Sequence, residues 1–164
     1  MKYFCAKQKK ENKCMIVYPP DKKIILFDGV CNLCNTAVLK VIQHDLKNRF
    51  VFCPLQSEAG QQIRNSLKID AVKLDSLILY TPGISYEIKA NAVLQIMNDL
   101  GGFWKLTQIF WILPEVVRNH LYDCIAKNRY RWFGKKQQCM RPTPELNARF
   151  LETALPKIHE QKNP

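Results

Sequence analysis

The sequence lacks an apolar stretch long enough to cross a membrane. Its longest apolar run, residues 103–113, is interrupted by Lys105, Thr107 and Gln108, whereas a spanning helix needs about 20 mostly apolar residues. Residues 1–20 also lack the continuous apolar segment of a secretory signal. We therefore expect a protein without a transmembrane segment that acts in the cytoplasm.

Acidic residues are scarce. Fourteen Asp and Glu stand against 25 Lys and Arg, which gives a net charge of +11. Such a charge suits nucleic acid, an anionic membrane surface or an acidic partner. The basic residues are spread along the chain, however, and neither zinc-finger spacing nor an aromatic-glycine RNA-binding signature is present. A solvated basic surface is the simpler interpretation, and we do not expect nucleic acid as a partner.

The cysteines do not form an evenly paired set. There are seven, and secreted disulfide frameworks are usually smaller and evenly paired. Without a secretory signal we expect reduced thiols, so a close pair indicates catalysis or metal binding rather than a structural disulfide. Cys5 and Cys14 fall in residues 1–22, which we interpret as a polar N-terminal arm, and these two are most simply incidental.

After this arm, the apolar pattern predicts an α/β core at residues 23–101. Strands are expected at 23–27, 49–53, 76–80 and 84–88, and helices at 31–45, 57–67 and 90–100. The order is β-α-β-α-β-β-α, with a parallel β-α-β half followed by a hairpin. This is the layout of a thioredoxin-like domain, and no internal repeat interrupts it.

Residues 102–155 predict a helical C-terminal extension of the same domain, followed by a tail at 156–164. Helices are expected at 103–113, at 115–130 and from the N-cap Thr143 to about residue 155. The second of these ends in a segment of alternating cations and aromatic side chains, residues 129–136. We expect its aromatic side chains to pack in the core and its cations to favour the helix C-terminus.

Cys31 and Cys34 are the most informative residues of the chain. They lie three positions apart, directly after the first strand and at the start of the first helix. Helical residues at this spacing have Cβ atoms about 5–6 Å apart, and a disulfide needs Cα atoms about 4.4–6.8 Å apart. The sulfurs can therefore bond and separate with little backbone movement, and the helix N-terminus favours a thiolate on Cys31.

Two kinds of chemistry fit this pair. In the redox interpretation, Cys31 is the more exposed sulfur and attacks a substrate disulfide, and Cys34 then resolves the mixed disulfide. In the alternative, the pair is half of a metal site that needs two more ligands. The candidate ligands are Cys53, Cys124, Cys139 and His44. None is paired at ligand spacing, so we favour the redox interpretation, which needs no bound cofactor.

Asp28, three residues before Cys31, allows two interpretations. Burial at the end of a strand would raise its pKa toward neutrality and make it a proton relay for the resolving thiol. Alternatively, its carboxylate accepts hydrogen bonds from backbone amides of the following turn. Gly29 is most simply a turn residue with positive φ.

The segment from Asp28 to Cys34 resembles the signature of the DCC family of predicted thiol–disulfide oxidoreductases. The resemblance extends over about residues 23–151, because similar segments recur in the same order: residues 54–57, 75–76, 92–94, 112–114 and 128–134, Cys139, and Arg149-Phe150. It implies a thioredoxin-like fold and dithiol–disulfide exchange, with Asp28, Cys31 and Cys34 as the matching residues.

Two positions depart from related proteins. Thioredoxins have a cis-proline before the third strand where this chain has Asp75-Ser76, and many DCC family members have Ser-Asp-Ala where this chain has Ala90-Asn91-Ala92.

The expected partners are a disulfide-containing protein or small-thiol substrate and a cellular thiol reductant. A binding module that uses a basic face of the same scaffold is the alternative function.

Overall fold

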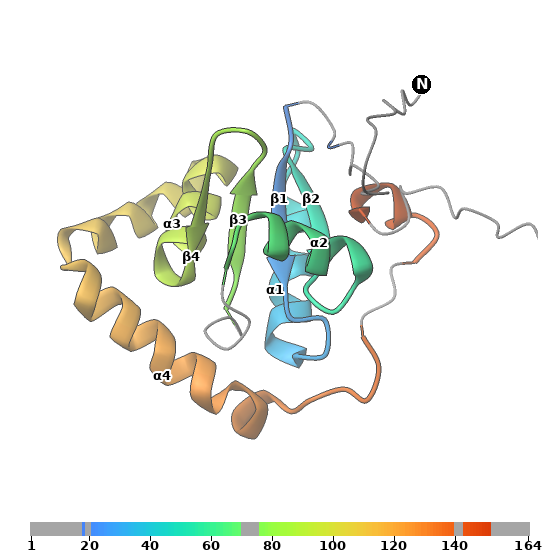
Figure 1. Ribbon diagram of the computed structural model, residues 1–164. Helices are drawn as coiled ribbons and strands as arrows, with labels where there is room; N and C mark the ends of the chain where they lie inside the picture. Colours follow the sequence, from blue (N-terminus) through green and yellow to red (C-terminus); the bar gives the residue numbers. More distant parts are fainter. Residues whose placement is uncertain (1–17, 19–20, 70–75, 140–142, 152–164) are drawn as a thin grey trace, which may run out of the picture.

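A four-stranded mixed sheet forms the centre of the computed structural model (Figure 1). The structure describes residues 18, 21–69, 76–139 and 143–151. Strand β1 (Lys23–Phe27) pairs in parallel with β2 (Phe50–Pro54) and antiparallel with β3 (Ile78–Thr81), and β3 pairs antiparallel with β4 (Ser85–Ile88). The sheet order is β2-β1-β3-β4. The predicted parallel unit joined to a hairpin is confirmed.

Helices cover both faces of this sheet. Helices α1 (Asn32–His44) and α3 (Lys89–Leu100) pack on one face, and α2 (Glu58–Ser66) packs on the other. The predicted Ser57 N-cap is confirmed, because the Ser57 hydroxyl accepts a hydrogen bond from the Gly60 amide at 3.0 Å. The order of elements is the one expected for a thioredoxin-like core.

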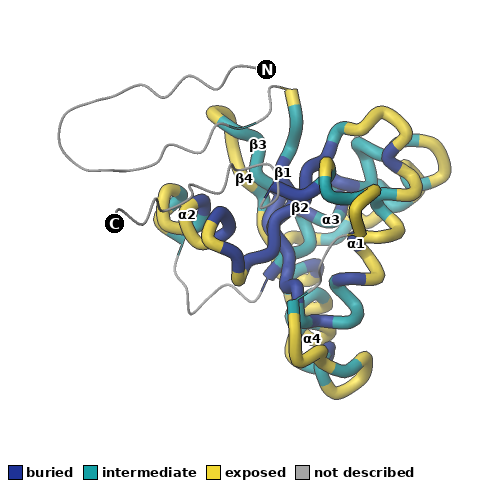
Figure 2. Tube along the Cα trace, turned by 90° about the vertical axis from the view of Figure 1, so that its right-hand side faces the viewer, coloured by how far each residue is buried: buried dark blue, intermediate teal, exposed yellow. Residues whose placement is uncertain are grey.

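Residues 24–27 of strand β1 are apolar and are buried on both faces of the sheet. Successive side chains of a strand point to opposite faces. Ile24 accordingly packs in a cluster with Ile63 of α2, whereas Ile25 packs in a second cluster with Val38 of α1 and Ile96 of α3. Figure 2 shows β1 and β2 as largely buried. A central strand at this position therefore places the following turn, residues 28–31, at the edge of the core.

The C-terminal extension is helical, as predicted, but it packs differently. Residues 102–112 form a 3-10 helix, η2 (Gly102–Ile112), rather than an amphipathic α-helix, and none of its residues is buried. Helix α4 (Glu115–Phe133) follows and ends at Gly134, whose φ is 80°. Trp132 and Phe133 are exposed, so the expectation that these aromatic side chains pack in the core is wrong. No helix of the described residues is long and apolar enough to cross a membrane.

The helix predicted from Thr143 to about residue 155 is wrong over residues 143–150. A turn and the short 3-10 helix η3 (Asn147–Arg149) lead into Phe150, which forms an isolated parallel bridge with Phe52. Phe150 and Leu151 are both buried, and they enter clusters on opposite faces of the sheet. The backbone at Phe150 is extended, which lets these two consecutive side chains point to opposite faces. Most of the predicted arm and the whole predicted tail lie outside the described residues.

Candidate functional site

Cys31 and Cys34 lie together at the N-terminus of α1. Cys31 is the N-cap residue, and its Sγ accepts a hydrogen bond from the Cys34 amide at 3.4 Å. The two sulfurs are not joined by a disulfide. The Cys31 sulfur therefore satisfies one of the backbone amides that have no partner within the helix at its N-terminus.

Exposure of the two sulfurs is the reverse of the sequence-based expectation. Cys31 is 0% exposed, whereas Cys34 is partly exposed. Cys31 is covered because the chain beyond α4 pairs with the motif: Lys135 forms an antiparallel bridge with Cys31, and the Lys136 amide donates to the Val30 carbonyl at 2.8 Å. The expectation that Cys31 is the more exposed thiol is therefore wrong.

The environment of Cys34 holds a proton on its sulfur. Burial raises the pKa of Cys34 above its ordinary value, and a hydrogen bond with Cys31 and the charges of Cys31 and Asp28 raise it further. The positive charge of Arg129 opposes these effects without overcoming them. The partly exposed sulfur is thus the protonated one, beside a sulfur that accepts an amide hydrogen bond.

Asp28 is the centre of a buried hydrogen-bond network. Its side chain is 4% exposed and pairs with the guanidinium of Arg129, which is 5% exposed, with 3.0 Å between Oδ2 and Nη2. The carboxylate also accepts hydrogen bonds from Gln56 Nε2 at 2.8 Å, from the Val30 amide at 3.1 Å and from the Tyr130 hydroxyl. Three distant segments of the chain therefore meet at this one side chain.

This network lowers the pKa of Asp28. Burial alone would raise the pKa, but hydrogen bonds from Tyr130, Val30, Gln56 and Arg129 to the ionised form outweigh burial. The expectation of a pKa raised toward neutrality is wrong, because sequence reasoning counted burial without the hydrogen bonds from Tyr130, Val30, Gln56 and Arg129 that stabilise the ionised form. The alternative interpretation, acceptance of a turn amide, is confirmed by the Val30 hydrogen bond.

Gly29 is required by close packing and not by its backbone conformation. Its φ is not positive, contrary to expectation. A Cβ atom placed on Gly29 would lie 2.0 Å from Sγ of Cys139 and 3.3 Å from Oε1 of Gln56. Gln56 Oε1 accepts a hydrogen bond from the Gly29 amide at 3.1 Å, and Asn35 Nδ2 donates to the Gly29 carbonyl at 3.0 Å. The turn between β1 and α1 is thereby held from both sides.

Sequence reasoning did not assign Gln56, Arg129 and Tyr130 to the site. All three fall in segments 54–57 and 128–134, which carry the resemblance to the DCC family. The presence of these family segments was the signal in the sequence that could have assigned the three residues to the site. Nothing in the local sequence distinguishes Arg129 from the exposed cations nearby. Among the described residues, no group of three His, Cys, Asp or Glu side chains is placed to hold a metal ion.

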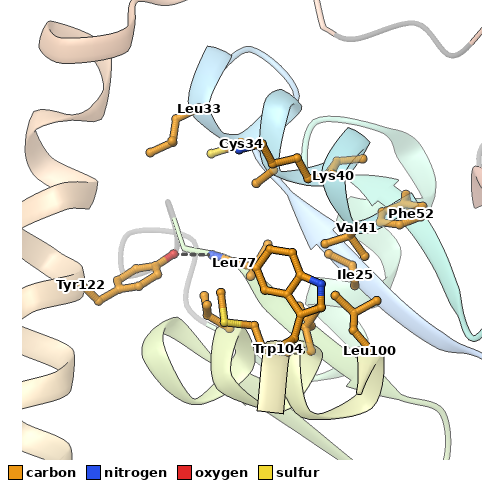
Figure 3. A pocket seen from close by; sticks show the side chains of 15 residues that line it. Ile25, Leu33, Cys34, Lys40, Val41, Phe52, Leu77, Leu100, Trp104 and Tyr122 are labelled. Carbon is orange, nitrogen blue, oxygen red and sulfur yellow. Dashed lines mark hydrogen bonds between the residues drawn. The ribbon is translucent and has the colours of Figure 1, made fainter. Parts of the chain in front are cut away.

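An apolar cavity of about 350 Å³ lies beside Cys34. Its walls come from α1, α3, η2 and α4, over the sheet strands β1 and β2. Figure 3 shows Cys34 on α1 at one end of this space, with Trp104 and Tyr122 on other walls. The partly exposed sulfur of the pair therefore borders a space that a substrate group could occupy.

A family model and a similar protein name the same family. The family model of DCC1-like thiol-disulfide oxidoreductase matches residues 25–135. The uncharacterized protein YuxK of Bacillus subtilis (strain 168) is 42% identical over 129 residues, which cover 79% of this chain and 93% of that relative. A DCC family protein of Arabidopsis thaliana, named as chloroplastic, is 40% identical over 124 residues, which cover 74% and 72%. No solved structure shows a significant match.

Proposed function

Because the chain belongs to the family of DCC1-like thiol-disulfide oxidoreductases, we propose that it exchanges its Cys31/Cys34 dithiol with the disulfides of protein or small-thiol substrates. The observation that carries this proposal is the pair itself at the N-terminus of α1, with one sulfur capping the helix and the other partly exposed. A cellular thiol reductant would restore the dithiol. Such thiols are abundant in the cytoplasm, where we expect the protein to act.

The exposures of the two sulfurs support a definite order of events. Cys34 loses its proton to water and attacks a substrate disulfide R–S–S–R′, which forms Cys34–S–S–R and releases R′–S⁻. R′–S⁻ takes the proton from Cys31, and the Cys31 thiolate then attacks the Cys34 sulfur. This forms the Cys31–Cys34 disulfide and releases R–S⁻, which takes a proton from water. Two electrons have then passed from the dithiol to the substrate.

Asp28 acts in this proposal as a positioning residue. Its carboxylate accepts a hydrogen bond from the Val30 amide and anchors Arg129 and Tyr130 of α4. Helix α4 leads directly into the segment that covers Cys31. Through these contacts Asp28 holds the motif turn and its cover together without exchanging a proton with the sulfurs.

A trapping experiment tests the order of events. Full-length protein with Cys31→Ser is expected to accumulate a mixed disulfide with hydroxyethyl disulfide on Cys34, because the sulfur that resolves the adduct is gone. The Cys34→Ser variant is expected to accumulate far less adduct at Cys31. Cys124→Ser, which changes an exposed cysteine of α4, is the matched control and is expected to cycle normally.

A redox titration tests the proposal as a whole. Wild-type protein equilibrated with glutathione redox buffers is expected to interconvert between dithiol and Cys31–Cys34 disulfide in one two-electron transition. A pair that stays reduced or oxidised in every buffer, or disulfide reduction that persists when both cysteines are replaced by serine, would refute the proposed function.

A further inference from the structure

The cavity beside Cys34 is larger than disulfide exchange alone requires. Exchange needs room for two or three sulfur atoms, but this space of about 350 Å³ is within the range of small-molecule pockets, about 300–1,000 Å³. Its walls are supplied by four helical elements and by the sheet. A bound group would therefore be surrounded by protein rather than laid on an open surface.

The chemistry of the walls selects apolar groups. Apart from Cys34, Lys40 and Tyr122, every lining residue has an aliphatic, aromatic or thioether side chain. The Tyr122 hydroxyl already accepts a hydrogen bond from the Leu77 amide at 2.9 Å. Lys40 is exposed, so its methylene chain can line the cavity while the ammonium group stays in water. Recognition here depends on the burial of apolar surface.

The position of Cys34 connects this space to the redox pair. Cys34 is the member of the pair that lines the cavity, whereas Cys31 is fully buried behind the chain at Lys135. Tyr122 lies on another wall of the same cavity (Figure 3). A group that fills the cavity would bring an attached sulfur to Cys34 and not to Cys31.

We propose that this cavity is the subsite for an apolar alkyl or aryl group carried by a small-molecule thiol or disulfide that exchanges with Cys34. The inference rests on the proposed function, because it specifies the substrate class of the same dithiol. The substrate would place its apolar group among α1, α3 and η2, with its sulfur against Cys34. Polar disulfides would react without this contribution from binding.

Alkyl methanethiosulfonates, CH₃SO₂–S–R, provide the test. The Cys34 thiolate displaces methanesulfinate and forms Cys34–S–S–R, and this step needs no other oxidant. The full-length Cys31→Ser protein keeps the adduct in place. Peptide mass spectrometry measures the rate at Cys34 relative to the exposed Cys124 of the same molecules, which corrects for reagent differences.

The expected result is a chain-length preference confined to Cys34. Each buried methylene contributes up to about a fourfold gain, so the rate ratio of Cys34 to Cys124 should rise at least about tenfold from the methyl to the hexyl reagent. It should fall again for chains too long for the cavity. The same chain-length dependence at both cysteines would overturn the inference.

Two substitutions on α1 locate the effect. Ala37→Phe fills the cavity one turn beyond Cys34 and should abolish the preference, whereas Leu39→Phe, on the same helix but outside the cavity walls, should retain it. An undiminished preference in Ala37→Phe would assign the effect elsewhere and overturn the inference. Because Ala37 and Leu39 are both exposed, neither phenylalanine needs space in the core.

Failure of this inference differs from failure of the proposed function. Hydroxyethyl disulfide is polar and tests exchange at the wild-type dithiol without the cavity. If exchange proceeds and the alkyl profile is flat, the substrate class is wrong and the oxidoreductase proposal stands. If exchange fails and the alkyl preference persists, the cavity binds apolar groups and the proposed function is wrong.

Discussion

Replacing Asp28 with asparagine should destabilise the fold strongly. The substitution keeps the shape of the side chain but removes the charge that faces Arg129 in a pair whose side chains are 4% and 5% exposed. Removal of one partner of a buried ion pair costs about 3–5 kcal/mol because the other charge is left uncompensated. We expect a loss in this range in urea unfolding of the reduced protein at pH 7.

The matched control is Asp123→Asn. Asp123 pairs with Lys89 at 2.8 Å, but its side chain is 37% exposed, and exposed pairs contribute about 0.2–1 kcal/mol. Arg129→Met in the Asp28→Asn background removes the uncompensated charge. The stability loss of the double variant should therefore be smaller than the summed losses of Asp28→Asn and Arg129→Met measured singly, by at least about 1 kcal/mol.

The pH dependence gives a second measure of the same interaction. The pKa of Asp28 is lowered from an ordinary value of 3.8, so its stabilisation is fully present above pH 3.8 and is lost as pH falls through the folded-state pKa. The stability difference between wild type and Asp28→Asn should therefore shrink in strong acid. A loss below 1 kcal/mol at pH 7, or a difference unchanged down to pH 2, would refute the reasoning.

Three further predictions concern other parts of the structure. Gly29→Ala should lower the free energy of urea unfolding by about 1–3 kcal/mol, because its Cβ would meet the Cys139 sulfur. Cys139→Ala in that background should recover part of this loss. No recovery would contradict the contact. The rate at which iodoacetamide alkylates Cys34 should reach half of its maximum at a pH above 9.0, because the pKa of Cys34 is raised. Cys31→Ala should lower this midpoint, because it removes a hydrogen bond and a charge that raise the pKa. Equal midpoints in the two proteins would be evidence that Cys31 does not affect the ionisation of Cys34. Phe150→Ala should cost about 3–5 kcal/mol, since Phe150 is buried among aromatic rings, and a loss under 1 kcal/mol would rule out that packing.

The order of strands and helices in the core was predictable because it depends on local patterns. The apolar run at 23–27 and the Ser57 cap are each encoded within a few residues, and both appear in the structure as expected. Where long-range packing decided the conformation, prediction failed. Residues 143–150 carry helix-start residues, yet they form a turn and the short 3-10 helix η3, and the backbone is extended at Phe150, which bridges to Phe52 of the sheet.

The exposed apolar surface of the C-terminal extension is a second feature that sequence patterns did not predict. The spacing of residues 103–113 is that of an amphipathic helix, but periodicity indicates only that a face is apolar, not that an element is present to cover it. In the structure, none of the residues of η2 is buried. Trp132 and Phe133 at the end of α4 are exposed for the same reason.

Cys31 and Cys34 show which features of the site follow from the sequence and which require the tertiary structure. The sequence alone determined that two thiols stand one helical turn apart at the start of α1, because a spacing of three residues after a buried strand is local information. Only the tertiary structure decided which thiol reaches the surface and how Asp28 ionises. Lys135 covers Cys31, and Arg129 and Tyr130 hold Asp28. These partners lie about 100 residues away in the sequence, so their effect arises only when α4 packs against the core.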